Sequence, residues 1–336
     1  MEGQILRADG QTGVLTRAGI SDAIKTAEPI WIDFSAFDEE AQEVLAHDFK
    51  LHPLAIEDAA HFGQRPKFES YDTFVHLVVY GVGTGSPDTG TGTGAGTGTG
   101  TGAGSLVEVH CFYSPDFLIT VHRDPLPEFD QLRAHAAVVR RHGRASCVLL
   151  LYRMVDSLVD SFFPILDHFD DGIDELEDEI LHDPTESQLG QLFDMKRSLV
   201  GYRKVVTPMR DMFAGIAAGA LELAGMTRDA ERYYRDVYDH LIRISDLVDS
   251  YRDLLTSSVD THLSVVSNRL NVVMKQLTII ATVFLPLSFI TGFFGQNFSW
   301  LVAHIEGGAI FVGFGIGLEI ATIVALVLFF RKRGWL

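Results

Sequence analysis

The sequence contains few cysteines and lacks the motifs of common catalytic centres. Cys111 and Cys147 are its two cysteines among 336 residues, and they form no CxxC pair. This excludes a disulfide framework and a cysteine-rich zinc centre, and it predicts two buried thiols in a reducing compartment. A nucleophile elbow and an HExxH zinc motif are also missing. An enzyme is therefore not expected.

Basic side chains are scarce relative to acidic ones. The chain has 27 Lys and Arg residues against 45 Asp and Glu residues, which gives a formal net charge of -18. Nucleic-acid binding requires a clustered basic face, so no nucleic-acid partner is expected, whereas a negative field attracts cations. The first residues, MEGQILRADG, lack the apolar core of a signal peptide. Residues 1–270 are therefore expected to stay inside the cell.

The segment 82–105 has almost no side chains that a core would bury, because it alternates glycine with threonine and alanine. Such a composition predicts a flexible surface loop, which we expect to join two adjacent strands. The strict alternation contains no GxGxxG register and no following GK[ST]. The glycines therefore do not predict a nucleotide site.

Residues 1–144, which include this insert, have the pattern of a cytoplasmic α/β domain. Short β-branched and aromatic runs are separated by turn residues and by two helical patterns. Strands are predicted at 29–34, 73–82, 106–113 and 117–122, and helices around 41–47 and 55–60.

Residues 145–229 are predicted to form an acidic helical hairpin. A helical pattern extends from 145 to 182, Asp183-Pro184-Thr185 ends it, and 187–212 is its return partner. Nine acidic residues lie between 167 and 183. They are interpreted either as a solvated helix face or as a field that concentrates Mg2+.

A very long helix is predicted from 230 to 294, with a stalk at 230–276. At ~1.5 Å per residue it is more than about 95 Å long. Its last part, 277–294, has no charged side chain, and a second apolar run follows at 308–330. Both can cross a ~30 Å hydrocarbon core, so 277–336 is predicted to be a two-helix transmembrane domain. The basic tail at 331–333 places both termini in the cytoplasm.

A polar seam follows the long helix in alternating steps of four and three residues. It consists of Asp260, Ser264, Ser267, Asn271, Met274, Thr278, Ala281, Leu285, Ser288 and Gly292. Small and hydroxyl side chains permit a tight helix interface. The other interpretation is that several copies of the helix surround a water-filled axis.

The stretch NVVMKQLTIIATVFLPLSFITGFFGQNF resembles the inner helix and signature loop of the CorA family of divalent-cation channels. The resemblance continues upstream through YYRDVYDHLIRISDLVDSYRDLLTSSVDTHLSVVSNRL and downstream to RKRGWL. It implies an α+β membrane protein with an N-terminal cytoplasmic α/β domain, and a long stalk helix that continues into the first of two transmembrane helices. It also implies a funnel-shaped homopentamer in the cell (inner) membrane.

The resemblance further implies passive, potential-driven transport of hydrated Mg2+, with Co2+ or Ni2+ as further substrates. Its expected partners are other copies of the chain, membrane lipid and divalent cations. Mg2+ would be both transported and regulatory, and no organic cofactor is expected. One alternative is a zinc transporter of the same family with proton coupling. A membrane-tethered sensor or scaffold that conducts no ions is an alternative of another class.

By the resemblance, Gly295, Gln296 and Asn297 form the selectivity filter, where Gln296 replaces the usual methionine. Asn297 is also interpreted as a helix cap. The predicted pore lining and gate consist of Ser288, Leu285, Thr278, Leu277, Met274 and Asn271, with core packing as the alternative role of Leu277 and Met274. Asp260 is predicted at the cytoplasmic pore mouth.

Asp236 matches an acid that, in the family, binds regulatory Mg2+ between subunits. Its usual partner acid is missing after the strand 73–82, so Asp239 or Asp88 is suggested as a substitute.

The second apolar run has a ridge of small residues, which is predicted to pack against the first run. The ridge consists of Ala309, Gly313, Gly317, Ala321 and Ala325. Glu319 lies on another face of the same run. An ionised carboxylate costs at least ~2.5–3.5 kcal/mol in a membrane span, so Glu319 is expected to be paired, protonated or snorkelling. Proton coupling through Glu319 is a further hypothesis.

Overall fold

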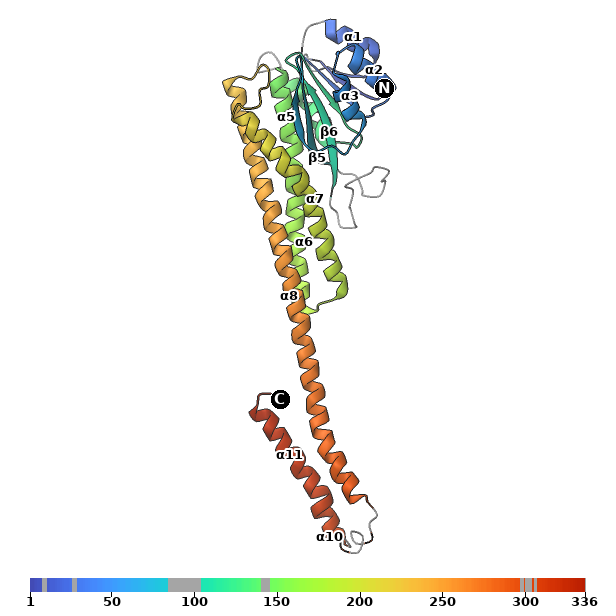
Figure 1. Cartoon of the computed structure of the whole chain (residues 1–336), viewed down its shortest axis with the longest axis vertical. Helices are drawn as coiled ribbons and strands as arrows, with labels where there is room; N and C mark the ends of the chain where they lie inside the picture. Colours follow the sequence, from blue (N-terminus) through green and yellow to red (C-terminus); the bar gives the residue numbers. More distant parts are fainter. Residues whose placement is uncertain are drawn as a thin grey trace. The chain divides into compact units, whose positions relative to one another are not determined.

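The structure is a computed structural model. It describes residues 1–7, 11–25, 29–83, 104–139, 146–296, 299, 304 and 307–335. The chain divides into two compact units, Met1–Val259 and Asp260–Leu336. The first unit contains the α/β domain and a helical hairpin, and the second contains two apolar helical segments (Figure 1).

A seven-stranded sheet forms the centre of the first unit among the described residues, with the order β2-β1-β3-β7-β6-β5-β4. Its strands are β1 Gly3–Leu6, β2 Thr12–Val14, β3 Ile30–Phe34, β4 Lys67–Ser70, β5 Val75–Gly83, β6 Ser105–Tyr113 and β7 Phe117–Val121. The neighbours β3 and β7 are parallel, and the other neighbouring pairs are antiparallel. In the longest pairing, Val75 of β5 lies opposite Tyr113 of β6, and Gly83 lies opposite Ser105.

Two layers of helices cover the two faces of the sheet (Figure 1). The helices α1 Arg17–Lys25, α2 Glu39–His47 and α3 Pro53–Ala60 share one core with Ile30, Ile32 and Phe34 of β3. Trp31, between these residues, belongs to the core on the opposite face, as the period of two in a strand requires. Asp38 caps α2 by accepting a hydrogen bond of 2.9 Å from the Ala41 amide.

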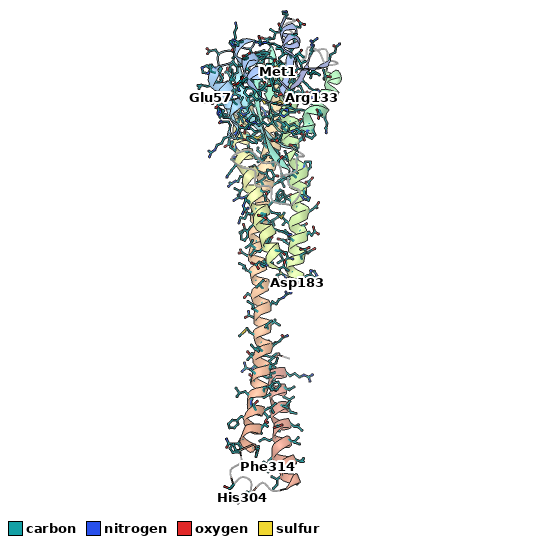
Figure 2. The ribbon with its side chains drawn as sticks, turned by 90° about the vertical axis from the view of Figure 1, so that its right-hand side faces the viewer. Met1, Glu57, Arg133, Asp183, His304 and Phe314 are labelled. Carbon is teal, nitrogen blue, oxygen red and sulfur yellow. The ribbon has the colours of Figure 1, made fainter. Side chains whose placement is uncertain are left out.

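The helices on the other face are α4 Pro127–Val139, α5 Cys147–Asp160, α6 Phe162–His182, α7 Glu186–Ala217 and the first part of α8 Arg228–Phe294. The helices α6 and α7 form the hairpin (Figure 1). Along α6 the buried side chains recur in steps of four and three: Phe162, Leu166, Phe169, Ile173, Leu176 and Ile180. Thr185 and Gln188 form a capping box at the start of α7, next to the turn at Asp183 that is labelled in Figure 2.

The predicted strands and helices of the α/β domain are present, with ends shifted by one or two residues. The segment 82–105 links β5 to its antiparallel neighbour β6, as expected. The pattern from 145 to 182 consists of two helices that meet at Ser161. The elements β1, β2, β4, α1 and α4 were not predicted from the sequence. The three strands are short and depend on neighbouring strands for their hydrogen bonds. The four-part domain division stays a prediction.

The second unit contains two helical segments that are long and apolar enough to cross a membrane. The first is the end of α8, a single helix of 67 residues. The second joins α10 Gly308–Ile310, a π-helical turn η2 at Phe311–Ile316, and α11 Gly317–Lys332. The fold therefore combines an N-terminal α/β domain, a long helix and two apolar spans, as predicted.

Candidate functional site

The polar seam occupies one face of α8 in the second unit. From Asp260 to Gly292 its residues are exposed in the single chain. The half-buried residues of the apolar part lie on nearly the opposite face: Lys275, Ile279, Val283, Pro286, Leu287, Ile290 and Phe294. The seam is thus not covered by the second span.

Two contacts fix the face of α8 that is turned to α11. Lys275 Nζ donates a hydrogen bond of 3.3 Å to the carbonyl of Gly334, just after α11. Near the other end, Thr291 Oγ1 lies 2.9 Å from Glu319 Oε1. Neither Lys275 nor Thr291 is a seam residue, and the two contacts leave the seam residues exposed.

The contact face of α11 differs from the prediction. The half-buried residues of the second span include Gly315 of η2 and Glu319, Thr322 and Leu326 of α11, whereas the ridge from Ala309 to Ala325 is exposed except at Gly317. The predicted packing of this ridge against α8 is wrong. Because Glu319 requires a polar partner in an apolar span, its contact with Thr291 turns another face of α11 towards α8.

Two hydroxyl groups of the seam donate their protons to the backbone of their own helix. Thr278 Oγ1 donates a hydrogen bond of 2.7 Å to the Met274 carbonyl. Ser264 Oγ donates one of 2.9 Å to the Asp260 carbonyl. A hydroxyl that donates to its own helix keeps acceptor capacity on its exposed side. This side of α8 is therefore suited to accept hydrogen bonds from the water shell of a cation.

Three long apolar side chains interrupt the oxygen acceptors. Met274 is 59% exposed, Leu277 58% and Leu285 73%. In this chain they pack against no core, so their exposure is compatible with a constriction formed by several copies of α8. Asn271, also exposed, lies one turn before Met274.

The predicted filter begins where α8 ends. The Gly295 amide donates to the Thr291 carbonyl at 2.9 Å, and the Gln296 amide donates to the Phe293 carbonyl at 3.3 Å. A side chain at Gly295 would lie 3.1 Å from the Thr291 carbonyl oxygen, which is a tight contact. Gly295 and Gln296 are thus placed at the helix end, and Asn297 lies outside the described residues.

Asp236 joins a second candidate cation site in the first unit, with Asp156 and Asp160 of α5 and His240 of α8. His240 Nδ1 lies 3.2 Å from Asp160 Oδ1 and 3.9 Å from Asp156 Oδ1, while His240 Nε2 lies 3.9 Å from Asp236 Oδ1. One ligand atom each from Asp156, Asp236 and His240 lies within 4.8 Å of the others. Three carboxylates and an imidazole can hold a divalent cation.

The electrostatics of this cluster favour a cation. Burial, and then the neighbouring Asp160, raise the pKa of Asp156 above its ordinary value. Tyr152 stabilises the carboxylate by donating a hydrogen bond of 3.2 Å to Asp156 Oδ2. A cation between the carboxylates would relieve their mutual repulsion.

Only part of this cluster was predicted from the sequence. Asp236 was predicted, but Asp156, Asp160 and His240 were not. Each helix carries its pair at positions i and i+4, a spacing that puts both side chains on one face and could have indicated them. Asp239 is exposed and does not belong to the cluster, and Asp88 lies outside the described residues.

The acidic residues of α6 face solvent, with the exception of Glu177. Glu177 is half-buried and accepts a hydrogen bond of 2.5 Å from Ser258 Oγ of α8. Glu179 accepts one of 3.2 Å from Gln188 Nε2. The arrangement is a solvated helix face, and it also leaves the negative field on the surface of the hairpin.

Known proteins match this chain over most of its length. The family described as CorA-like Mg2+ transporter protein matches residues 26–332. The cobalt/magnesium transport protein CorA of Thermotoga maritima is 31% identical over 314 residues, 93% of this chain and 84% of that protein. The zinc transport protein ZntB of Enterobacter sp. is 31% identical over 196 residues, 58% of this chain and 56% of that protein.

A solved structure has the same fold. The complete structure of the CorA magnesium transporter of Methanocaldococcus jannaschii gives a TM-score of 0.79 at 20% identity, and the match covers 100% of this chain and 99% of that one. Together with the two apolar spans, the matches indicate a membrane protein that transports divalent metal ions and is not an enzyme. The resemblance noted in the sequence is confirmed, and the chain belongs to the family of CorA-like Mg2+ transporter proteins.

Proposed function

We propose that the chain forms a homopentamer whose α8 helices line a passive pore for hydrated divalent cations, with Mg2+ as the main substrate. The observation that carries this proposal is the polar seam, which is exposed and turned away from α11. A seam of small and oxygen-bearing side chains has no reason to face lipid. If copies of the same helix surround an axis, the seam faces water and ions instead of lipid.

The chemistry of Mg2+ favours such a path. Mg2+ keeps its octahedral water shell, so a pore that accepts the hydrated ion avoids the cost of dehydration. Thr278 and Ser264 supply the required oxygen acceptors. A divalent ion that enters an inside-negative cell gains about 4.6 kcal/mol per 100 mV, twice the value for a single charge. This gradient makes ATP or another energy source unnecessary.

The residues along the proposed ion path have different roles. Gly295, Gln296 and Asn297 form the filter ring, in which amide and carbonyl oxygens contact the hydration shell. Met274, Leu277 and Leu285 form apolar constrictions that gate by dewetting, Asn271 and Ser288 add oxygen rings, and Asp260 receives cations at the cytoplasmic mouth. Both termini lie in the cytoplasm, and the protein resides in the cell membrane.

Asp236 is proposed as a ligand of regulatory cytoplasmic Mg2+. Its support is the cluster with Asp156, Asp160 and His240, in which a cation would offset the repulsion between carboxylates. Asp239 is proposed as a further acid that faces a neighbouring subunit. Binding at these acids would hold the pentamer closed when internal Mg2+ is high.

Zinc transport is the second candidate. It is supported by the relative named as a zinc transport protein and by Gln296, which departs from the usual methionine of the family signature. As a zinc transporter, the protein would move protons together with Zn2+, so a pH gradient would drive transport. Mg2+ stays the first choice because the seam offers oxygen rather than imidazole or thiolate ligands.

Flux through reconstituted liposomes tests both candidates. We expect Mg2+ influx driven by an inside-negative potential, its loss in Asn297→Ala, and no change in Asn268→Ala, an exposed amide of α8 outside the seam. Zn2+ influx that follows an imposed pH gradient would favour the zinc candidate. Absence of flux for both ions, or full Mg2+ flux in Asn297→Ala, would contradict the proposed pore and its filter, respectively.

A further inference from the structure

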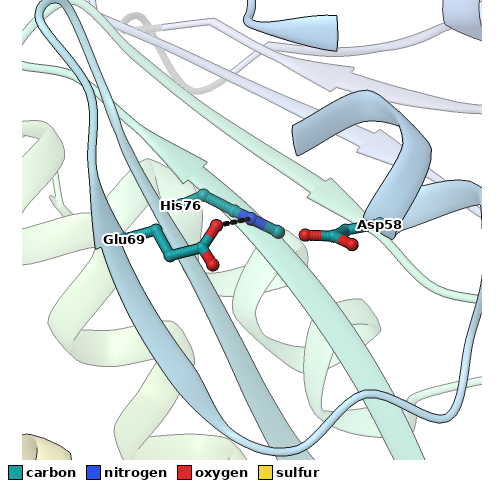
Figure 3. A group of neighbouring side chains, drawn as sticks. All are labelled: Asp58, Glu69 and His76. Carbon is teal, nitrogen blue, oxygen red and sulfur yellow. Dashed lines mark ion pairs between the residues drawn. The ribbon is translucent and has the colours of Figure 1, made fainter. Parts of the chain in front are cut away.

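A group of ionisable side chains on the α3 face of the sheet has no part in transport as proposed above. It comprises Asp58 of α3, Glu69 of β4 and His76 of β5, drawn in Figure 3. One ligand atom from each residue lies within 4.8 Å of the other two. The antiparallel register places Glu69 directly opposite His76, so the two side chains emerge on the same face.

His76 points a buried nitrogen into this group. The residue is 0% exposed, and among the described residues no group lies within hydrogen-bond distance of Nδ1. The nearest carboxylate oxygen, Glu69 Oε2, is 3.7 Å away, as the dashed line in Figure 3 marks. A buried ring nitrogen without a partner is costly, so its retention requires a reason.

A relay of hydrogen bonds from Glu108 through His110 to His76 determines whether His76 Nδ1 carries a proton. Glu108 accepts from the backbone amides of Gly63, at 2.5 Å, and Gln64, at 3.1 Å, as an ionised carboxylate does. His110 Nε2 lies 2.9 Å from Glu108 Oε1 and therefore donates to it, which leaves His110 Nδ1 as an acceptor.

The relay continues to His76. Its Nε2 lies 3.1 Å from His110 Nδ1 and must donate the proton that this bond needs. In the neutral ring, Nδ1 of His76 then carries a lone pair, and this lone pair faces the carboxylates of Glu69 and Asp58. A lone pair beside two carboxylates is repulsive unless a cation lies between them.

The cation now next to the carboxylates is Lys67. Its ammonium donates a hydrogen bond of 2.5 Å to Asp58 Oδ2 and one of 2.9 Å to Glu69 Oε1. Two of its three ammonium protons go to the carboxylates, and no hydrogen bond from Lys67 reaches His76 Nδ1 in the described structure. A metal ion, in contrast, can bind two carboxylates and an imidazole nitrogen at once.

We propose that Asp58, Glu69 and His76 Nδ1 bind a divalent transition metal ion of the zinc class, which displaces the Lys67 ammonium from the two carboxylates. One imidazole nitrogen and two carboxylate oxygens are ligand types that zinc accepts, and they leave a fourth position for water. The chain from Glu108 through His110 to His76 orients the ligating ring, as second ligand shells do in metalloproteins. Mg2+ is disfavoured because it seldom takes a nitrogen ligand. This site does not depend on the proposed pore.

Cobalt binding to the full-length protein tests the proposal. The protein in detergent is stripped with a chelator and titrated with Co2+ in excess Mg2+, and bound Co2+ is counted by equilibrium dialysis while ligand-field absorption is recorded. Wild type is expected to bind one Co2+ per chain more than His76→Gln or Glu69→Gln. Asp72→Asn, which removes an exposed acid in the adjacent β4–β5 turn, should bind as wild type does.

Lys67→Met gives the complementary test, because it removes the competing ammonium and both carboxylates remain. Its Co2+ affinity is expected to rise at least about tenfold, which corresponds to ~1.4 kcal/mol. Circular dichroism establishes that each variant is folded. If His76→Gln does not fold, Glu69→Gln and Lys67→Met decide the outcome. An unchanged Co2+ count in folded Glu69→Gln or His76→Gln, or an unchanged affinity in Lys67→Met, would overturn the proposal.

Discussion

Glu319 of α11 places a carboxylate oxygen 2.9 Å from the hydroxyl of Thr291 on α8. The contact gives a polar partner to an ionisable residue in an apolar span, where an unpaired charge would cost at least ~2.5–3.5 kcal/mol. It also determines which face of α11 is turned to α8. Thr291 Oγ1 also donates a hydrogen bond of 2.8 Å to the Leu287 carbonyl, so its contact with Glu319 is compatible with a protonated carboxyl group as well as with a paired carboxylate.

The first prediction concerns this contact. Glu319→Gln retains a group that can hydrogen-bond Thr291, so cation flux and its pH dependence are expected to match wild type. Flux is measured in liposomes over a series of pH values, with Glu319→Leu as the variant that cannot make the bond. If Glu319→Gln loses the pH dependence, although it can still bond Thr291, the result would instead support proton coupling and the zinc candidate.

The second prediction separates the seam from the rest of the membrane unit. Thr278 and Thr322 both donate a hydrogen bond to the carbonyl four residues earlier, at 2.7 and 2.8 Å, but only Thr278 lies on the seam. Thr278→Val removes an acceptor from the proposed ion path. A hydrogen bond contributes about 0.5–1.5 kcal/mol, so Mg2+ flux should fall about two- to tenfold.

The matched variant Thr322→Val makes the same chemical change on α11, where flux is expected to stay at the wild-type rate. Initial rates of Mg2+ influx at a fixed potential provide the comparison. Equal losses in the two variants would show that the threonines act through helix stability and not through the pore.

The third prediction concerns the cluster around Asp236. Asp236→Asn removes one carboxylate from a site shared with Asp156, Asp160 and His240. The internal Mg2+ concentration that halves influx should rise about tenfold, which corresponds to ~1.4 kcal/mol of lost binding free energy. Liposomes preloaded with graded Mg2+ give this value. Asp246→Asn, an exposed acid of the same helix, is the control and should leave it unchanged.

The parts of the fold that could be predicted are those whose pattern lies within a short stretch of the sequence. The long helix and its seam were visible because residues three and four apart share a helix face, whatever surrounds them. The strand β1 was missed because its pairing with β3 joins Ile5 to Ile32, and no local pattern marks it. The insert was placed between adjacent strands because its composition excludes it from any core.

The candidate sites also combine residues that a local pattern indicates with residues that only the fold brings together. Asp236 was found through a motif, but its neighbour Asp156 lies on another helix, and nothing in one sequence states that α5 and α8 meet. The relay through His76 and His110 depends on strand register, because Val78 lies opposite His110 and His76 opposite Phe112. A shift of one residue would turn either ring to the other face of the sheet.

The fourth prediction uses a buried ion pair in the α/β domain. His122 Nε2 lies 3.2 Å from Asp33 Oδ1, and both residues are at most 4% exposed. Burial by itself favours the neutral forms, but the attraction within the ion pair outweighs it. The pair, together with Thr120 and Arg133 beside the carboxylate, lowers the pKa of Asp33, and the carboxylate raises the pKa of His122.

The signs of these shifts determine the pH dependence of stability. The Asp33 contribution is present above its unfolded pKa of about 3.9 and is lost as pH falls through the lowered folded value. The His122 contribution is complete below its unfolded pKa of about 6.5 and is lost as pH rises through the raised folded value. The pair thus stabilises the domain most between about pH 4 and pH 6.5.

Replacement of the imidazole tests this window. His122→Gln should lower the unfolding temperature of the full-length protein more at about pH 6 than at about pH 9, because only the protonated ring gains from Asp33. Thermal unfolding in detergent, followed by circular dichroism, measures the difference, and His47→Gln in α2, an exposed histidine, is the control with no such dependence. The same loss of unfolding temperature at both pH values would mean that His122 contributes by packing alone, and that the charge of the pair adds nothing to the stability of the domain.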